Sequence, residues 1–379
     1  MFFIIVLTVN LVVNLYLFFR TRPLFPAGTT MWWLAAIAFW VLAFSYVIGR
    51  FLERADNGNL AQPFIVTGSW WMGAMVYLTL LFLLIDLVRG LNGLFNATEL
   101  FRFSWYDIKG KTAIILTYSI TAIILLIGYY NARMPVIRNV AIHLEKEVPG
   151  ESQKVVLVSD LHLGMMISNG KLTKMVDLIN REKADIVLLA GDVFDEDLGP
   201  VIKNNMGDLL KELKAKHGVF AVLGNHEFYG NAEAAQKYLQ DHRIIVLRDS
   251  VAVLENGIII AGREDLTYER MSNNTRKPVK ELLAGVNDSL PIFLMDHQPM
   301  NLQEAANSPI DLQVSGHTHN GQMWPFNYIT DAIFEVGKGY EKINSTHFYV
   351  SSGYGTWGPP MRTNSRSEII VFNITNSNS

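Results

Sequence analysis

The first 132 residues consist largely of four apolar runs separated by short polar segments. The runs cover residues 1–19, 31–49, 67–88 and 112–130. Each is close to the roughly 20 residues that a helix needs to cross the hydrocarbon core of a bilayer. The first run lacks the positively charged start and the small-residue cleavage site of a signal peptide, and three more runs follow it. The pattern therefore predicts a multi-pass membrane domain of four transmembrane helices.

Tryptophans and one acidic residue mark positions of interest in this region. Two tryptophan pairs lie near the starts of the second and third runs, and we expect them at the level of the lipid headgroups. They are Trp32, Trp33, Trp70 and Trp71. Asp86 lies near the end of the third run, where a functional role and simple solvation at the interface both remain open.

The pattern changes after residue 132. Residues 133–154 are mixed and polar with two prolines, which indicates a linker that can include a leading strand. Beyond them, short β-rich runs alternate with amphipathic stretches, an alternation that predicts one layered α/β domain. The predicted strands are residues 155–159, 186–190, 219–223, 258–261, 292–295, 312–315 and 348–351, and the predicted helices are 171–181, 203–216 and 232–241. The expected domains are therefore a membrane domain at 1–132, a linker at 133–154 and a catalytic domain at 155–379.

Composition excludes several classes of function. The formal net charge is −3 without a basic excess, so we expect no nucleic-acid partner. The chain has no cysteine, which excludes disulfides, thiol catalysis and cysteine-held zinc.

Five polar clusters each follow a predicted buried strand directly. In open α/β sheets, ligands bind outside the carboxyl ends of the strands, where residues distant in sequence meet. Five of the nine histidines fall in these clusters. The clusters are Asp160-Leu-His162, Gly191-Asp192, Gly224-Asn225-His226-Glu227, His297 and Gly316-His317-Thr-His319.

The residue types in these clusters are those that bind first-row divalent cations: imidazole nitrogen, carboxylate oxygen and amide oxygen. Asp160 and His162 are two residues apart, so on an extended segment their side chains face the same way, and the same holds for the histidines at 317 and 319. The glycines that precede the clusters would let the backbone turn sharply as it leaves the sheet. Each motif alone also fits an ordinary loop, and only the complete ordered set favours a metal site.

The ordered set resembles the calcineurin-like metallophosphoesterase superfamily over about residues 155–372. Its bacterial membrane-associated branch is the most similar, because Gly-Gln follows the Gly-His-Thr-His block and a glycine-rich segment ends in Pro-x-Arg at Arg362. Asn320 departs from that branch, which often has glycine there, although asparagine tolerates a left-handed backbone. Glu196 stands where protein phosphatases have arginine, which argues against a phosphoprotein phosphatase.

The resemblance implies a four-layer α-β-β-α fold and two divalent metal ions, manganese before iron, zinc or cobalt. It assigns Asp160, His162 and His319 to the first metal, with Asp192 as the bridge. The second metal would be held by Asn225, His297 and His317. Paired cations can activate a bridging hydroxide that attacks phosphorus, so no protein nucleophile is required.

The resemblance also casts His226 as the residue that faces the leaving-group oxygen, and Asp195 as the carboxylate that orients it. For Asp195 a surface turn is the alternative. Arg362 is a candidate for binding a substrate phosphate, and a structural ion pair is equally open. Four aromatic residues near the motif blocks could form an apolar shelf for an acyl chain, with core packing as the alternative: Phe194, Trp324, Tyr328 and Trp357.

We therefore expect a membrane-anchored dimetal phosphohydrolase that cleaves a phosphodiester or pyrophosphate bond, with lipid-linked or cell-envelope substrates and membrane lipids as its partners. The alternatives are a non-catalytic sensor or scaffold with a metal-binding domain, and a transporter with an accessory domain. Few ionisable residues lie at mid-membrane depth, which argues against the transporter.

The distribution of Lys and Arg gives the expected orientation. Positive residues favour the cytoplasm. The loops opposite the catalytic domain carry Arg20, Arg22, Arg89, Arg102, Lys109 and Lys111, and the catalytic side carries Arg50, Arg54, Arg133, Arg138 and Lys146. The count is six against five, so we expect the catalytic domain outside the cytoplasm.

Overall fold

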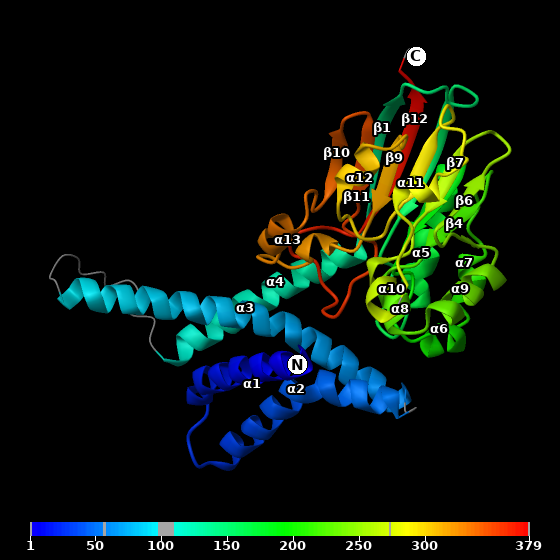
Figure 1. Ribbon diagram of the computed structural model, residues 1–379. Coiled ribbons are helices and arrows are strands. Elements are labelled where there is room, and N and C mark those ends of the chain that lie inside the picture. Colours follow the sequence, from blue (N-terminus) through cyan, green and yellow to red (C-terminus); the bar gives the residue numbers. More distant parts are fainter. Residues whose placement is uncertain (1, 56–57, 98–109, 273, 378–379) are drawn as a thin grey trace. The chain divides into compact units, whose positions relative to one another are not determined.

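The computed structural model describes residues 2–55, 58–97, 110–272 and 274–377 (Figure 1). The chain forms two compact units, which are described in turn. The first comprises Met1–Gly128 and the short segment Gly358–Pro360, and the second comprises Tyr129–Trp357 and Met361–Ser379.

The helices of the first unit follow the four apolar runs. They are α1 (Phe2–Thr21), α2 (Thr30–Arg54), α3 (Gly58–Ala97) and α4 (Lys111–Arg133), with a 3₁₀ turn, η1 (Arg22–Leu24), after α1. All four are long and apolar enough to cross a membrane, which confirms the prediction of four long apolar helices. The helices extend beyond the apolar runs, because α2 continues to Arg54 and α3 starts at Gly58 and runs to Ala97. The segment between the third and fourth runs also includes residues 98–109, which lie outside the described residues.

The core of the first unit contains polar side chains that are paired. Trp71 is buried with Leu17, Leu78, Phe82 and Ile114, and its indole nitrogen donates a hydrogen bond of 2.8 Å to Asn14 Oδ1. The Trp71 ring therefore packs between helices instead of facing outward, and its level in a membrane stays a prediction. Such polar pairs hold helices together where water is absent.

Asp86 is also paired. It accepts a hydrogen bond of 2.8 Å from the Tyr16 hydroxyl and forms an ion pair with Arg20, so α1 and α3 are linked by charge as well as by packing. Asp86 is therefore a paired carboxylate that links two helices, and not one that is only solvated.

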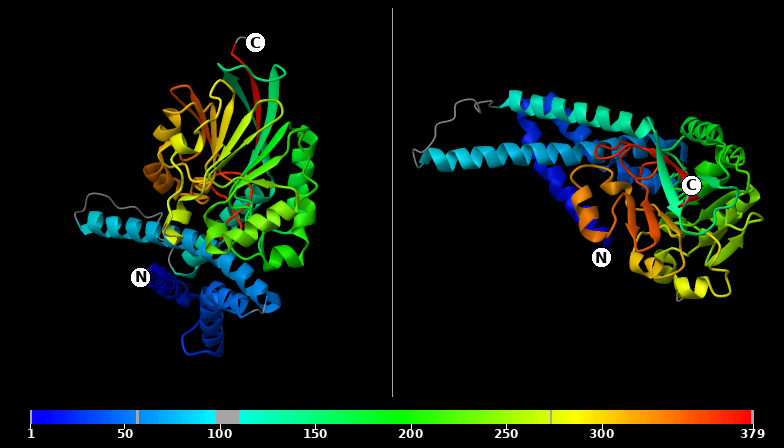
Figure 2. Two further views of the ribbon diagram at one scale, coloured as in Figure 1. Left: turned by 45° about the vertical axis from the view of Figure 1, so that its right-hand side comes forward. Right: turned by 90° about the horizontal axis from the view of Figure 1, so that it is seen from above.

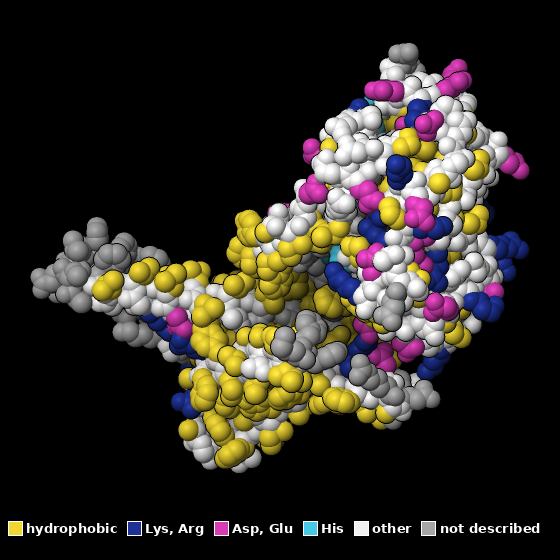
Figure 3. Space-filling view, viewed as in Figure 1, with side chains coloured by type: hydrophobic (Ala, Val, Ile, Leu, Met, Phe, Trp, Pro, Cys, Tyr) yellow, Lys and Arg dark blue, Asp and Glu magenta, His cyan; other side chains and the backbone are white. Residues whose placement is uncertain are grey.

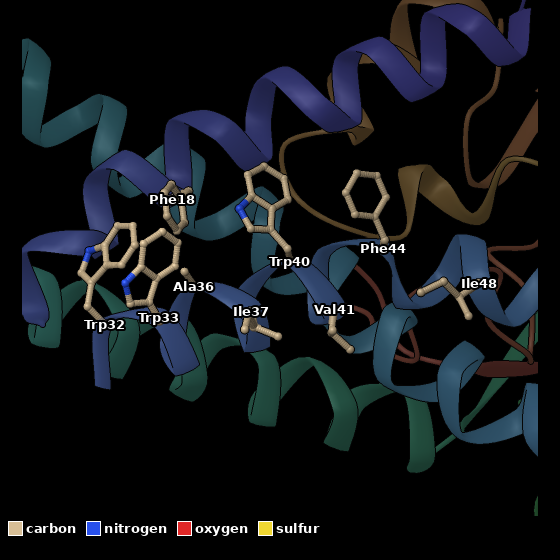
Figure 4. Close-up of a pocket in the computed structure, with 9 residues that line it drawn as sticks. All are labelled: Phe18, Trp32, Trp33, Ala36, Ile37, Trp40, Val41, Phe44 and Ile48. Carbon is tan, nitrogen blue, oxygen red and sulfur yellow. The ribbon is translucent and has the colours of Figure 1, made fainter. Parts of the chain in front are cut away.

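A pocket lies between Phe18 of α1 and one face of α2 (Figure 4). Its lining consists of aliphatic and aromatic side chains, with the indole rings of Trp32 and Trp33 in edge-to-face contact at 4.6 Å between centroids. Such a mainly apolar lining suits acyl chains.

The second unit is built on two six-stranded mixed sheets. In the first, the order is β1 (Val136–Leu144), β12 (Glu368–Asn376), β2 (Ser152–Val158), β3 (Ile186–Ala190), β4 (Val219–Val222) and β5 (Ile245–Val246). In the second, it is β10 (Gly339–Ile343), β11 (Thr346–Val350), β9 (Leu312–Ser315), β8 (Ile292–Met295), β7 (Ile259–Gly262) and β6 (Ser250–Val253).

Alternation along the strands builds four layers from these sheets. In β3, Ile186 and Leu188 belong to the core between the two sheets, whereas Val187 and Leu189 belong to the core against the helices on the outer face. Successive strand residues point to opposite faces, so one strand serves two cores. Helices α5 (Asn169–Glu182) and α9 (Ala232–Asp241) cover the first sheet, and α11 (Val279–Leu282) and α12 (Leu302–Ala306) cover the second (Figure 2). The expected α-β-β-α fold is confirmed.

Most predicted elements of this unit lie where the sequence places them. The strands at 186–190, 292–295 and 312–315 and the helix at 232–241 have the predicted bounds. The predicted helix at 203–216 is wrong: α6 (Gly199–Lys203) and α7 (Met206–Leu210) are separate, because Asn205 has a left-handed backbone with φ 50°. Within the expected linker, β1 pairs in parallel with β12 and so belongs to the first sheet.

Candidate metal centre

The candidate ligands lie at the carboxyl ends of five strands. Strands β2, β3 and β4 are parallel neighbours in the first sheet, and β8 and β9 are parallel neighbours in the second. Their carboxyl ends therefore lie at a shared edge of each sheet. The structure brings all seven predicted ligands together there.

One group consists of Asp160, His162 and His319, which offer ligand atoms within 4.8 Å of one another. The Nε2 atoms of the two histidines are 3.0 Å apart, and His319 Nε2 is 3.5 Å from Asp160 Oδ1. Two imidazole nitrogens and a carboxylate oxygen thus converge on one point.

A second group consists of Asp192, His297 and His317, again with ligand atoms within 4.8 Å. The amide oxygen of Asn225 lies in the same place, 2.7 Å from His317 Nδ1 and 3.3 Å from His297 Nε2. His297 Nδ1 is 2.7 Å from the carbonyl oxygen of Ala190, which can accept a hydrogen bond from Nδ1–H and leave Nε2 free for a metal.

Asp192 lies between the two groups. Its Oδ2 is 3.2 Å from His297 Nε2 and 3.8 Å from His162 Nε2. Its Oδ1 accepts a hydrogen bond of 2.9 Å from the backbone of His226. One carboxylate therefore faces both groups and is oriented by the loop after β4.

The backbone at these residues is left-handed rather than extended. Asp160, His162 and Asp192 have φ near 50°, and His317 and His319 have φ of 70° and 47°. The expected extended geometry of the two His-containing pairs is therefore wrong, although their side chains do converge. A left-handed non-glycine residue costs about 1–3 kcal/mol and tends to persist at functional sites. Asn320 has φ 51°, so the asparagine adopts the conformation that its type tolerates.

Two glycines are required for different reasons. Gly191 has φ +85°, a conformation that only glycine adopts without strain. Gly224 has an ordinary φ of −108°, so the expected sharp turn is not its role. A Cβ atom at Gly224 would collide with Asp192 Oδ1. The smallest residue is therefore needed for close packing around the shared carboxylate.

Glu227 has a structural part that its motif alone did not reveal. Its carboxylate accepts hydrogen bonds from the backbone amides of Gly224, Asp192 and Phe194 at 2.7, 3.1 and 2.8 Å. It thereby joins the loops after β3 and β4. Burial, assisted by the charge of Asp192, raises the pKa of Glu227 to about 7. The sequence signal for this role is a glutamate directly after the Asn-His pair.

The residues present fit divalent cations. Asp160 Oδ2 and His162 Nδ1 are buried without a hydrogen-bond partner, which is costly unless another group satisfies them. Burial, together with the charges of neighbouring cationic groups, lowers the pKa of His317 to about 4 and that of His319 well below its usual value. These imidazoles are therefore neutral, as metal ligands must be. The donor set of imidazole, carboxylate and amide suits manganese, iron, cobalt or zinc.

His226 and Asp195 form a pair beside the two groups. His226 Nδ1 is 3.3 Å from Asp195 Oδ1, and His162 Nδ1 is 3.7 Å from the same oxygen. Burial lowers the pKa of His226, but Asp195 and the charge of Asp192 outweigh that effect and raise the pKa to about 9. Burial likewise disfavours the Asp195 anion, yet the two imidazoles lower the pKa of this carboxyl below its usual value. Nδ1 faces the Asp195 carboxylate at 3.3 Å, so the other ring nitrogen of His226 is the one able to reach a ligand.

Arg362 lies in a different environment from the one expected. Its side chain is fully buried, and its donors bind the carbonyl oxygen of Gly355 and the hydroxyl of Ser365. One terminal nitrogen is 3.3 Å from His319 Nδ1. This burial argues against the predicted contact with a substrate phosphate. The guanidinium instead contacts Nδ1 of His319, the ring nitrogen that does not face the metal group.

The comparisons with known proteins agree with this geometry. The family model described as calcineurin-like phosphoesterase matches residues 153–321. An uncharacterized metallophosphoesterase of Helicobacter pylori is 32% identical over 254 residues, which cover 66% of this chain and 67% of that protein. One of Aquifex aeolicus is 32% identical over 235 residues, covering 62% of this chain and 89% of that protein.

A third relative covers more of the chain. The transmembrane protein with metallophosphoesterase domain of Bos taurus is 27% identical over 355 residues, which cover 85% of this chain and 78% of that protein. Together with the four long apolar helices, this likeness supports membrane association. The fold, the convergent metal-binding residues and the relatives identify a metal-dependent phosphoesterase, and the chain belongs to the calcineurin-like phosphoesterase family.

Proposed function

We propose that the chain is a membrane-anchored dimetal phosphohydrolase that cleaves a phosphodiester or pyrophosphate bond of a lipid or cell-envelope precursor. One observation carries the proposal. Two convergent groups of metal-binding side chains face a single carboxylate, Asp192, at the carboxyl ends of parallel strands. Two cations that share an anionic ligand can be held close together, since the ligand offsets their repulsion.

The roles follow from the two groups. Asp160, His162 and His319 hold one cation, with Asp192 shared. The second is held by Asn225, His297 and His317. When bound, the cations neutralise the phosphate and lower the pKa of water enough to supply the attacking nucleophile. The mixed nitrogen and oxygen ligands suit manganese, which we place first, and also iron, zinc or cobalt.

His226 serves the leaving group in this proposal. Asp195 faces its Nδ1 at 3.3 Å, which fixes the ring and favours the protonated form. The other ring nitrogen can then donate a proton or a hydrogen bond to the departing oxygen, a contribution of typically 10²–10⁴-fold. The charge of nearby cations would oppose protonation and make that proton easier to release.

The alternative of a non-catalytic sensor or scaffold is less well supported. A binding domain that lost catalysis needs neither a complete ligand set nor a leaving-group residue. Here all seven candidate ligands and the pair of His226 and Asp195 are present and adjacent.

We further propose a multi-pass membrane domain at 1–132 and a catalytic domain at 155–379, with 133–154 connecting them and contributing β1. The Lys and Arg count of six against five favours a catalytic domain outside the cytoplasm. The margin widens to six against two when Arg133, Arg138 and Lys146 are set aside, because a large folded domain translocates largely regardless of nearby charge.

The first prediction tests the shared carboxylate. Asp192→Asn should abolish hydrolysis of a chromogenic phosphodiester with added manganese, and metal analysis should show loss at both sites. The reason is that each cation loses its shared anionic ligand. Asp177→Asn, an exposed acid on α5, is the matched control and should behave as the wild type. Full metal content with normal turnover of Asp192→Asn would contradict the bridging role.

The second prediction tests the leaving-group role. His226→Ala should keep its metal but lose about 10²-fold or more in turnover of esters with poorly leaving alkoxides. Esters of acidic phenols need less assistance and should lose less. His143→Ala, at an exposed position on β1, is the control. Equal losses on both kinds of ester would sink the assignment.

The third prediction tests orientation. Protease added to intact spheroplasts should digest the part of the chain after Met134, as detected with an antibody against the catalytic domain. A cytoplasmic marker protein should stay intact in the same sample. Protection of the domain until the membrane is permeabilised would reverse the orientation and place the substrate in the cytoplasmic leaflet.

A further inference from the structure

An apolar patch on the second unit surrounds the short helix α13 (Asn327–Ile333). The patch consists of Trp324, Phe326, Tyr328, Ile329 and Ile333, whose exposed fractions are 48, 39, 64, 57 and 59%. We call it the α13 patch. Figure 3 shows apolar side chains gathering over α13, whereas on the visible surface of the strands and helices from β4 to β7 apolar side chains are scattered among polar and charged groups. Clusters of this kind mark sites of interaction.

The α13 patch has the arrangement of an interfacial segment. Phe326, Ile329 and Ile333 follow a spacing of three and four residues and so share one helix face. Asp331 is exposed on the opposite side, and Thr330 is buried against the domain. Tryptophan and tyrosine at the ends of the patch are the residues enriched where a membrane meets water.

Hydrogen bonds tie this patch to the end of the fourth long helix. The last turn of α4 belongs to the second unit, and Asn131 there donates to the carbonyl of Arg362 at 3.1 Å. The next residue, Thr363, donates its amide to Gln322 at 3.1 Å and accepts the amide of Trp324 at 2.9 Å. The patch therefore begins a few bonded residues away from the point where α4 ends.

The end of α4 has the features of a membrane interface. Tyr130 is exposed, and the guanidinium of Arg133 lies 5.1 Å from the centre of the Tyr129 ring. Aromatic and basic residues at the end of an apolar helix anchor it among the headgroups. This turn is hydrogen-bonded to Arg362, and the neighbouring Thr363 binds the amide of Trp324, so a short bonded path joins the end of α4 to the α13 patch.

A second set of bonds links the patch to the metal centre. Gln322 donates to the carbonyl of Trp357 at 3.0 Å and accepts its amide at 3.0 Å. The Trp357 ring is 54% exposed and lies 5.9 Å from the His226 ring, edge to face. Trp357 thus places an exposed aromatic ring beside the residue proposed to serve the leaving group, and Gln322, two residues before Trp324 of the patch, fixes its backbone. Phe194, expected in the same shelf, is buried in the core instead.

We propose that the α13 patch is seated among the acyl chains of the bilayer. The preferred substrates are then amphiphilic phosphate esters whose chains stay in the membrane while the phosphate reaches the metal centre past Trp357. The substrate part of this proposal rests on the proposed phosphohydrolase function. The seating of the patch does not, because it requires no turnover. The occupant is lipid because a short bonded path joins the patch to the end of α4, which has the features of a membrane interface.

The absence of cysteine allows a direct test of depth. Ile329→Cys labelled with an environment-sensitive fluorophore is reconstituted in nanodiscs of phosphatidylethanolamine and phosphatidylglycerol. Val253→Cys is the control, because β6 pairs Val253 with Ile259 at the amino end of β7, opposite the metal centre. We expect blue-shifted emission at 329 that bromine on the acyl chains quenches, and neither effect at 253. Equal behaviour of the two labels would overturn the proposal, as would a blue shift without quenching, which would indicate a protein partner or a second copy.

An activity test addresses the substrate class. The ratio of turnover on a lipid phosphoester in nanodiscs to turnover on a soluble phosphodiester is measured for the wild type and for two double variants. Ile329→Gln with Ile333→Gln should lower this ratio about tenfold or more, because each isoleucine side chain that enters the acyl chains contributes strongly to the free energy of membrane binding. Ile245→Gln with Val253→Gln, two exposed apolar positions on strands β5 and β6, should leave the ratio unchanged. An unchanged ratio in the patch variant would overturn the substrate class, whereas a wild type inactive on both substrates would overturn the proposed function and leave the fluorescence result to decide the seating.

Discussion

The second unit depends on one shared carboxylate. Asp192 is buried between two groups of imidazole and carboxylate ligands, with Oδ2 facing His297 and His162. A buried anion is costly without compensating charge, so its stability requires positive partners on both sides. Burial disfavours the Asp192 anion, but His297 and the nearby histidines lower the pKa of this carboxyl well below its usual value. The loops that surround Asp192 accordingly bring imidazole groups to both sides of its carboxylate.

The surrounding packing keeps that carboxylate in place at a cost in backbone strain. Five of the seven candidate ligands have left-handed backbones. Each such residue costs about 1–3 kcal/mol, and other interactions must offset this strain. Glu227 contributes by holding three backbone amides, and Gly224 by leaving room for the carboxylate. Metal binding would add to this compensation, because ligands that are folded in advance convert binding energy into folding stability. Cation binding would therefore help to offset the backbone strain at the ligands.

The sequence predicted the parts of this site that depend on pattern and chemistry, and missed those that depend on three-dimensional packing. Strands β3, β8 and β9 are continuous buried runs, so their ends and the donors after them could be located directly. The left-handed backbone at Asp160 could not be predicted, because only the surrounding loops impose it. An arginine can bind phosphate wherever it is exposed, so the sequence alone could not exclude this role for Arg362. The fold shows that its donors bind Gly355 and Ser365 instead. The interruption at Asn205 was missed for a related reason, since an amphipathic period continues across it.

The connection after α4 limits what such an enzyme can reach. Only Met134 and Pro135 separate Arg133, the last residue of α4, from Val136, the first residue of β1. Ser367 bonds to the carbonyl of Ala132 at 2.9 Å, so even the last helical turn is fixed to the sheet. A flexible linker samples a volume that grows with its length, whereas the two residues here join a helical turn and a strand that belong to the same unit. The last turn of α4 and the metal centre therefore belong to one packed unit, with no long linker between them.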